Sequence, residues 1–381
     1  MSQSRSEIEA ALSGALQDAI KDGVPGVSAV IRTSKGVVWQ GAAGLANIET
    51  ELPASSANVF GIGSITKVFV AVVILQLVEE GKLKLSDTLE DHLDEYLIQE
   101  VGNAKGASIA TLLSHSAGVE SWEDDPVWIV EGRGSGLDPQ KHWGKAEPLK
   151  YIQRPSPLKP GKISYSNTNF TYLGFVIEKV TRAPAEAEIR RRILEPLDLS
   201  DTFLEGFETH TASAKLPHRY HFATETFKSV AGICPGFSQP QEGLIDATPS
   251  NLSVEWTAGG MVSTPSDLTK LGLAIRDAKI FSKSSLAIMQ DFKKWTKGFE
   301  MGHSIFRYKS IQGYGTWCGH LGSVLGFTGV MFWEESSADC VVAVLANVGT
   351  MHCGPVPGSA YDVVLKGDFL KYALEFAALE D

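Results

Sequence analysis

The placement of strand-like segments is the feature that most restricts the fold of this chain. Residues 26–45, GVSAVIRTSKGVVWQGAAGL, carry β-branched residues on both sides of a turn at Ser34-Lys35-Gly36, which predicts two strands. Strand signals return near the other end, in YGTWCGHLG, VLGFTGVMFW and DCVVAVLANVG. From about residue 64 to 260 the pattern is that of helices and long loops, and within it HRYHFATETFKSV resembles a hairpin. We therefore expect the terminal segments to pair in one antiparallel sheet, with a largely helical lobe inserted between them.

Helices are predicted at both ends of the chain. Apolar residues at helical spacing over 7–22 indicate an amphipathic helix that ends at Gly23, and those of 361–376 indicate a final helix. These two helices should cover the sheet, which gives an α/β (α+β) fold class. The expected division is a discontinuous sheet domain, residues 1–62 and 262–381, and a mostly helical domain, residues 63–261.

Composition excludes several classes of partner. Lys plus Arg number 34 against 45 Asp plus Glu, a formal net charge of -11 that repels phosphate backbones and anionic lipids, so we expect no nucleic acid and no membrane. The N-terminal segment has no signal-peptide core, and the apolar run 68–78 is too short to cross a bilayer, which predicts a cytoplasmic protein. The four cysteines have no zinc spacing, and His218 and His221 have no paired ligand set, so neither metal nor cofactor is expected.

The segment GIGSITK places Ser64 three residues before Lys67 at the start of an apolar helix predicted from about 64 to 80. Residues three apart share a helix face, so Lys67 can fold back over Ser64, and the first-turn amides favour negative charge there. A serine needs such a neighbour to take its proton before it becomes a good nucleophile. The motif alone also fits an ordinary helix start, and a second SxxK, Ser156 to Lys159, lies in a proline-containing loop.

Two further motifs change this interpretation. Tyr165-Ser166-Asn167 lies in a loop directly before an apolar helix, and His320-Leu321-Gly322 lies at a strand end. With S-x-x-K, Y-x-N and K/H-x-G in this order, the chain resembles the serine β-lactamase and penicillin-binding-protein superfamily, in particular its branch of class C β-lactamases, D-amino-acid amidases, D-aminopeptidases and family VIII esterases. The phrases LLSHSAGV, ILEPLDLSDTF and TAGGMVSTPSDL extend the resemblance over roughly residues 7 to 350. It implies a β-lactamase-like fold: a five-stranded antiparallel sheet flanked by N- and C-terminal helices, with the active site between sheet and helical lobe.

The resemblance implies a role for each motif residue. Ser64 would be the nucleophile, Lys67 its proton-handling neighbour, and Tyr165 the general base and later general acid, with its pKa lowered by the nearby ammonium. The reverse arrangement, with neutral Lys67 as the base and Tyr165 as a relay, stays open at this point. Asn167 would orient Lys67 and the substrate, and the backbone amides of Ser64 and Ser323 would form the oxyanion hole.

The third motif departs from the class C pattern, which has lysine at the position of His320. Histidine is mostly neutral at cytoplasmic pH, so we expect it to anchor a substrate carboxylate only weakly; alternatively, it hydrogen-bonds a strand neighbour and no more. Gly322 would leave room for a substrate along the strand, and a β-bulge is the alternative. His115 of LLSHSAG is expected to be structural and to lie away from the three motifs.

These residues predict a serine hydrolase that cleaves a small ester or amide, of the esterase or D-aminoacyl amidase/peptidase type, through a Ser64 acyl-enzyme. An acyltransferase or peptide cyclase on the same fold is the alternative, and a β-lactamase, a DD-carboxypeptidase or a non-catalytic scaffold is less favoured. The predicted partner is the small-molecule substrate, and the sequence leaves room for a homo-oligomer. The aromatic-rich segments 120–150 and 217–256 offer walls for an acyl pocket, although core packing is the better prediction for any single aromatic.

Overall fold

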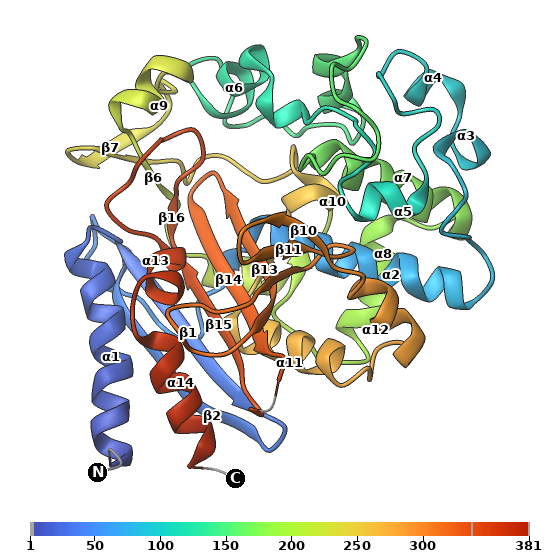
Figure 1. The fold of residues 1–381 in the computed structure, drawn as a ribbon. Helices are drawn as coiled ribbons and strands as arrows, with labels where there is room; N and C mark the ends of the chain where they lie inside the picture. Colours follow the sequence, from blue (N-terminus) through green and yellow to red (C-terminus); the bar gives the residue numbers. More distant parts are fainter. Residues whose placement is uncertain (1–3, 337, 380–381) are drawn as a thin grey trace.

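A nine-stranded sheet forms the centre of the computed structural model, which describes residues 4–336 and 338–379 (Figure 1). Neighbouring strands are antiparallel, in the order β10-β11-β12-β13-β14-β15-β1-β2-β3. The long strands come from the two ends of the chain, as predicted: β1 (Gly26–Thr33), β2 (Gly36–Asn47), β13 (Trp317–Val324), β14 (Phe327–Glu334) and β15 (Val341–Ala346). The predicted fold class is confirmed.

The sheet has more strands than the five expected. Beyond β13 it continues through β12 (Phe306–Tyr308), β11 (Phe299–Met301) and β10 (Lys293–Thr296), and beyond β2 it ends at β3 (Leu52–Pro53). These additions are short, and the exposed lysines and glycine of 293–298 interrupt the apolar alternation by which strands are predicted from sequence.

Helices cover both faces of the sheet. In β15, Val342 and Val344 belong to the apolar core shared with α1 (Arg5–Lys21), α13 (Ala360–Leu365) and α14 (Phe369–Ala378). The alternate residues Val341, Ala343 and Leu345 face the other core, which includes α11 (Pro265–Arg276) and the helical lobe. The predicted single final helix is wrong: the chain breaks at 366–368, where Gly367 disfavours helix, and forms α13 and α14.

The helical lobe is built around α2 (Thr66–Glu79), which is buried on nearly every side and is therefore apolar all round. The helices that pack directly on α2 include α7 (Asn167–Thr181) and α10 (Trp256–Gly259). The remaining helices of the chain are α3 (Leu89–His92), α4 (Glu95–Ile98), α5 (Ile109–Leu113), α6 (Pro126–Arg133), α8 (Ala185–Ile189), α9 (Glu225–Val230) and α12 (Lys283–Met289). Short 3-10 segments are η1 (Gly63–Ile65), η2 (Trp122–Asp124), η3 (Glu147–Ile152) and η5 (Thr211–Lys215), and η4 (Arg190–Leu194) is a π-helical turn.

Two small sheets complete the fold. One has the order β16-β6-β8-β7, from β16 (Val348–Gly349), β6 (Tyr220–Phe222), β8 (Leu244–Asp246) and β7 (Ser238–Gln241); the other has the order β4-β9-β5, from β4 (Phe60–Gly61), β9 (Met261–Ser263) and β5 (Phe203–Leu204). The segment HRYHFATETFKSV is not a hairpin. Its first half is β6, whose partner β8 lies further along the chain, and its second half is α9, capped by the Thr224 side chain on the amide of Phe227.

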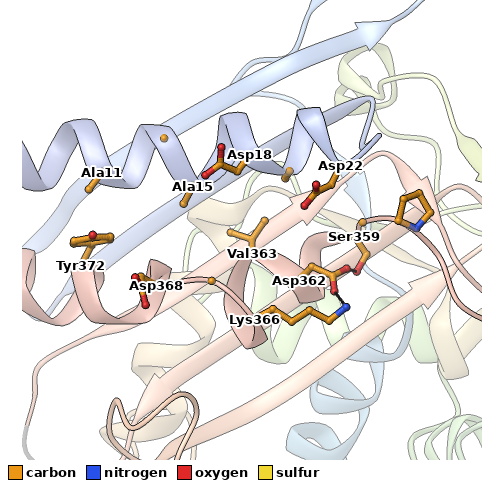
Figure 2. Close-up of a pocket in the computed structure, with 15 residues that line it drawn as sticks. Ala11, Ala15, Asp18, Asp22, Ser359, Asp362, Val363, Lys366, Asp368 and Tyr372 are labelled. Atoms are coloured by element: carbon orange, nitrogen blue, oxygen red, sulfur yellow. Dashed lines mark hydrogen bonds and ion pairs between the residues drawn. The ribbon is translucent and has the colours of Figure 1, made fainter.

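A groove of about 600 Å³ lies between α1 and the C-terminal helices (Figure 2). Small residues of α1 form one wall, and Asp362 on the other wall forms an ion pair with Lys366 at 2.5 Å and accepts a hydrogen bond from Ser359 at 2.6 Å. None of the motif residues singled out in the sequence lines this groove. It is therefore not the candidate site.

Among the residues described here, no helix is both long and apolar enough to cross a membrane. The domain boundaries at residues 62 and 262 stay a prediction.

Candidate active site

Ser64 lies at the start of the α2 segment, inside η1, and is partly exposed. The turn is tight against strand β13: Gly63 has a positive φ of 51°, and a Cβ on it would lie 2.6 Å from the amide nitrogen of Ser323. The predicted helix from about 64 to 80 is confirmed, with η1 continuing directly into α2. Its amino-terminal end therefore faces the sheet, with the serine hydroxyl between sheet and lobe.

Lys67 brings the first two motifs together. Its side chain is fully buried, and Nζ donates hydrogen bonds to Oγ of Ser64 at 2.9 Å, Oδ1 of Asn167 at 2.7 Å and the carbonyl of Ala258 at 2.6 Å. Residues 64 and 67 are neighbours on one helix face, whereas Asn167 begins α7 and Ala258 lies in α10. Three helices distant in sequence thus fix the amine beside the serine hydroxyl.

A buried ionic cluster lies behind this amine and was not predicted from sequence. Nδ2 of Asn167 donates to Glu123 at 2.5 Å, and Nη2 of Arg133 bridges Glu123 and Glu255, with 2.9 Å to the latter. All three charged side chains are nearly inaccessible, with residue exposures of 8%, 1% and 4% for Glu123, Arg133 and Glu255. A continuous chain of hydrogen bonds therefore runs from the guanidinium through Glu123, Asn167 and Lys67 to Ser64.

Burial brings two pKa values of this cluster close together. Desolvation lowers the pKa of Lys67 to about 7, although the charges of Glu123 and Glu255 oppose that shift. Desolvation raises the pKa of Glu255 to about 7, an effect strengthened by Glu123 and opposed by Arg133 and Lys67. At neutral pH a proton can thus reside on either group, and neutral Lys67 is readily accessible.

Tyr165 joins the same constellation. A hydrogen bond links its hydroxyl to that of Ser64, and Nζ of Lys67 lies 5.0 Å from its ring centroid. The expectation that the ammonium lowers the Tyr165 pKa is wrong: desolvation dominates and raises it well above 10, with Glu123 adding to the increase. The phenol is therefore neutral.

The sequence led us to expect His115 away from the three motifs, but the structure places it beside them. Its ring stacks on Tyr165 with 4.2 Å between centroids, and Nδ1 accepts a hydrogen bond from the amide of Ser166 at 3.0 Å. Burial, with lesser effects of Lys67 and His320, lowers the His115 pKa well below 6.5, so the ring is neutral. Its contacts hold the Tyr165-Ser166-Asn167 segment in place.

Gly322 is required by the approach of β13 to the nucleophile turn. A Cβ on Gly322 would lie 1.9 Å from the carbonyl oxygen of Ile62 and 3.2 Å from the amide nitrogen of Ser64. Gly322 also pairs in register with Gly329 of β14, without a register shift, so the bulge alternative does not hold. The same approach brings the amide of Ser323 next to η1. The Ser323 side chain is held in turn by Thr350, at 3.3 Å between hydroxyl oxygens.

His320 is buried beside the site, with its ring stacked on Phe306 at 4.3 Å between centroids. Nδ1 donates to the carbonyl of Leu321. Burial, reinforced by the charge of Lys67, lowers the His320 pKa to about 3, so the ring is neutral at physiological pH. The structure thus has the neutral, strand-bonded histidine that the sequence offered as an alternative to an anion anchor.

A cavity of about 300 Å³ opens over these groups. It is lined by Ser64, Ser121, Glu123, Asp124, Tyr165, Phe306, His320, Leu321, Ser323, Met351 and Tyr361. No lysine or arginine belongs to this lining among the described residues, whereas two carboxylates do. Desolvation, together with the nearby Glu123 and Glu120, raises the pKa of Asp124 to about 6, so it is ionised at neutral pH.

The aromatic side chains suggested as pocket walls lie elsewhere. Those of segments 120–150 and 217–256 are buried in the apolar cores: Trp122, Trp128, Trp143, Tyr220, Phe222, Phe237 and Trp256. The cavity uses Phe306 and Tyr361 instead, which follow no sequence motif. Within the described residues, no cluster of three or more His, Cys, Asp or Glu side chains could hold a metal ion.

The family model described as Beta-lactamase matches residues 8–354. The chain belongs to the beta-lactamase family. Protein flp of Staphylococcus aureus (strain NCTC 8325 / PS 47) is 27% identical over 236 residues, 61% of this chain but only 43% of its own length, so the chain spans less than half of that relative.

Solved structures share the fold of this beta-lactamase family member over nearly its whole length. The D-stereospecific amidohydrolase from a Streptomyces species is 26% identical, with a TM-score of 0.75 and coverage of 90% of this chain and 94% of its own. The D-amino acid amidase from Ochrobactrum anthropi SV3, complexed with D-phenylalanine, has a TM-score of 0.81 at 24% identity and coverage of 98% and 100%, which shows the common fold.

Proposed function

We propose that this protein hydrolyses a small ester or amide through an acyl-enzyme on Ser64. The observation that carries the proposal is the position of Nζ of Lys67, 2.9 Å from Oγ of Ser64 and held by Asn167 and Ala258. A serine hydroxyl fixed this close to an amine with a pKa of about 7 meets the requirement for an activated nucleophile.

In the proposed first step, Oγ of Ser64 attacks the substrate carbonyl while its proton passes to neutral Lys67. The C–O bond to Ser64 forms, the carbonyl electron pair moves to oxygen, and the leaving group departs with a proton as alcohol or amine. Water then attacks the acyl-enzyme, its proton passes to the same base, and the acid is released with Ser64 restored.

The electrostatics favour Lys67 over Tyr165 as the base. The pKa of Lys67 is lowered to about 7, whereas burial raises that of Tyr165 well above 10, so the neutral amine costs far less than the phenolate. The Tyr165 hydroxyl, hydrogen-bonded to Ser64, is the proposed proton relay to the leaving group.

The amides of Ser64 and Ser323 are the proposed oxyanion hole. Support comes from the contact of η1 with β13, where only glycine fits at positions 63 and 322 because a Cβ would meet the opposite backbone. The charge of the cavity favours a substrate with an amine near the scissile bond over one with a carboxylate there, since Glu123 and Asp124 line it. This supports an aminoacyl amide or ester over a β-lactam, and the name of the D-amino acid amidase from Ochrobactrum anthropi SV3 favours the D-aminoacyl amide. The cytoplasmic location and the homo-oligomer stay predictions.

Intact-mass spectrometry tests the proposal. The protein is exposed to a short p-nitrophenyl ester, a D-aminoacyl amide and a penicillin, and any adduct is mapped by peptide sequencing. We expect a transient acyl mass on Ser64 with the ester or the aminoacyl amide and none in Ser64→Ala. Turnover with unlabelled Ser64, or in Ser64→Ala, would contradict the mechanism. Added alcohol or amine acceptors distinguish hydrolysis from acyl transfer by the product formed.

A further inference from the structure

A second cavity, of about 760 Å³, lies beside the Ser64 cavity and carries the opposite charge. Three segments form it: α5 with the turn that follows, the loop at 161–163, and β10–β11 with their flanking residues. Its lining is Ala110, Thr111, Ser114, Ser116, Gly161, Lys162, Ile163, Asp291, Lys293, Lys294, Trp295, Met301 and His303. The cavity therefore combines three ammonium groups with serine and threonine hydroxyls and one indole ring.

Two of its three lysines have no anionic partner in the described part of the chain. Lys293 forms an ion pair with Asp291 at 2.8 Å, but Lys162 and Lys294 form none. The cavity thus has an excess of positive charge in a protein whose formal net charge is -11. The Ser64 cavity, by contrast, is lined by the carboxylates of Glu123 and Asp124.

A shared aromatic wall connects the two cavities. Phe306 lines the Ser64 cavity, and its ring lies 6.2 Å from that of Trp295, which lines the second cavity. On the other side, the segment 161–163 leads directly into Tyr165, and the amides of Gly161 and Ser164 bond to carbonyls of the α5 turn. The same two segments therefore form the floor behind the phenol and one wall of the lysine-lined cavity.

The strand register gives the separation. Lys293 pairs with Met301, Met301 with Phe306, and Phe306 with Gly319, next to His320. Three strand spacings amount to about 14 Å, and a lysine side chain reaches part of the way back. An anion in the second cavity would thus lie about 10 to 15 Å from His320 in the lining of the Ser64 cavity, the length of three or four extended peptide residues.

We infer that the lysine-lined cavity binds a carboxylate carried by the leaving-group end of the substrate. The inference rests on the proposed function and extends it: the substrate is a short peptide-like amide or ester with an amine near the scissile bond and a free carboxylate three or four residues beyond. The acidic lining at Ser64 matches the amine of this substrate, and the basic lining of the second cavity matches its carboxylate. A uniformly acidic protein surface would match only the amine. Lys162 and Lys294 are the principal specificity residues.

The test compares two tetrapeptides that differ only at the carboxyl end, which is a free carboxylate in one and an amide in the other. Each tetrapeptide is made with a D- and with an L-residue at its first position. We expect the wild type to favour the free carboxylate five- to tenfold in kcat/KM, through KM, and to lose most of that preference in 0.5 M NaCl. The corresponding dipeptides, too short to reach the cavity, should show no preference. The double variant Lys162→Ala/Lys294→Ala should lower the tetrapeptide ratio to near one.

Lys297→Ala is the matched control, because Lys297 lies in the turn between β10 and β11 but outside the cavity lining. A ratio that persists in the double variant, or that falls equally in Lys297→Ala, overturns the inference. Calorimetric binding of the two peptides to Ser64→Ala, with and without the lysine substitutions, tests the cavity without turnover. If calorimetry shows a preference for the free carboxylate but no substrate labels Ser64, the proposed function fails and the cavity assignment stands. If Ser64 is labelled but neither kcat/KM nor calorimetry shows that preference, only the inference fails.

Discussion

Replacement of Glu123 by glutamine tests whether the buried ionic cluster sets the protonation of Lys67. Glu123 accepts from Asn167 at 2.5 Å, and Asn167 accepts from Lys67 at 2.7 Å on its other amide atom. With one amide group of about 2.3 Å between them, carboxylate and ammonium lie about 7.5 Å apart or less. Two unit charges at that distance attract by about 2 kcal/mol at an effective dielectric constant of about 20, which corresponds to about 1.5 pKa units.

The direction of the pKa change of Lys67 depends on which protonation form of Lys67 the Glu123 carboxylate stabilises. Glu123 favours the ammonium, so Glu123→Gln should lower the pKa of Lys67 below its value of about 7. If neutral Lys67 is the base, wild-type kcat/KM rises with pH through about 7, and this rise should move about 1 to 1.5 pH units lower in the variant. The assay is the hydrolysis of a p-nitrophenyl ester between pH 4.5 and 9, corrected for the spontaneous reaction.

Two further variants separate this effect from loss of structure. Glu255→Gln removes a second charge that favours the ammonium without removing a contact to Asn167, so its profile should shift in the same direction. Asp94→Asn, which breaks only an exposed ion pair with Lys179, should leave the profile unchanged. Thermal unfolding confirms that each variant is folded. A profile that is unmoved or moves to higher pH in both folded glutamine variants would refute the reasoning.

Two other substitutions address the relay and the turn. Tyr165→Phe should lower kcat about 100- to 1,000-fold, within the range of general acid–base catalysis. In this variant kcat/KM should still rise near pH 7, because Lys67 titrates there. Disappearance of that rise would assign the base to Tyr165. Gly322→Ala should lower kcat/KM at least tenfold and the free energy of unfolding by about 1 to 3 kcal/mol, because its Cβ would lie 1.9 Å from a backbone oxygen. Gly14→Ala in helix α1 is the control, because its Cβ would have no neighbour within 4 Å; it should retain activity and raise the free energy of unfolding by up to about 1 kcal/mol. Equal activity of the two alanine variants would contradict the importance of the β13–η1 contact.

Local patterns predicted those parts of the fold and site that depend on neighbours in sequence. The periodicity of 64–80 predicted helix α2 and hence the shared face of Ser64 and Lys67, and the β-branched runs at both ends predicted the long strands. The gathering of Tyr165 and Asn167 around Lys67 depended on the family resemblance, since no local pattern links α7 to α2. Where the local signal was short or mixed, as in β10–β12 and the break at Gly367, the prediction was incomplete or wrong.

The buried cluster illustrates what sequence could not reveal. Glu123 lies in a 3-10 turn, Arg133 at a helix end and Glu255 directly before another helix. Nothing in their spacing indicates that one guanidinium joins both carboxylates. The expectation of a lowered Tyr165 pKa was wrong because burial, like the contacts of the cluster, cannot be seen in the sequence. Considered as an isolated pair with an ammonium, the phenol should become more acidic, but desolvation outweighs that attraction.

The balance of charge in this cluster explains how the fully buried amine of Lys67 could serve as the proposed base. Arg133 supplies one positive charge to the two glutamates that it bridges, and desolvation brings the pKa values of Lys67 and Glu255 together, to about 7 each. In the proposed mechanism Ser64 transfers its proton to Lys67, and the new ammonium forms beside carboxylates that favour it, without water having to reorganise. Carboxylates closer to Lys67 would hold it as a permanent ammonium, and an apolar surrounding would prevent it from accepting the proton. The separation through Asn167 is thus the physical requirement on which the proposed catalysis depends.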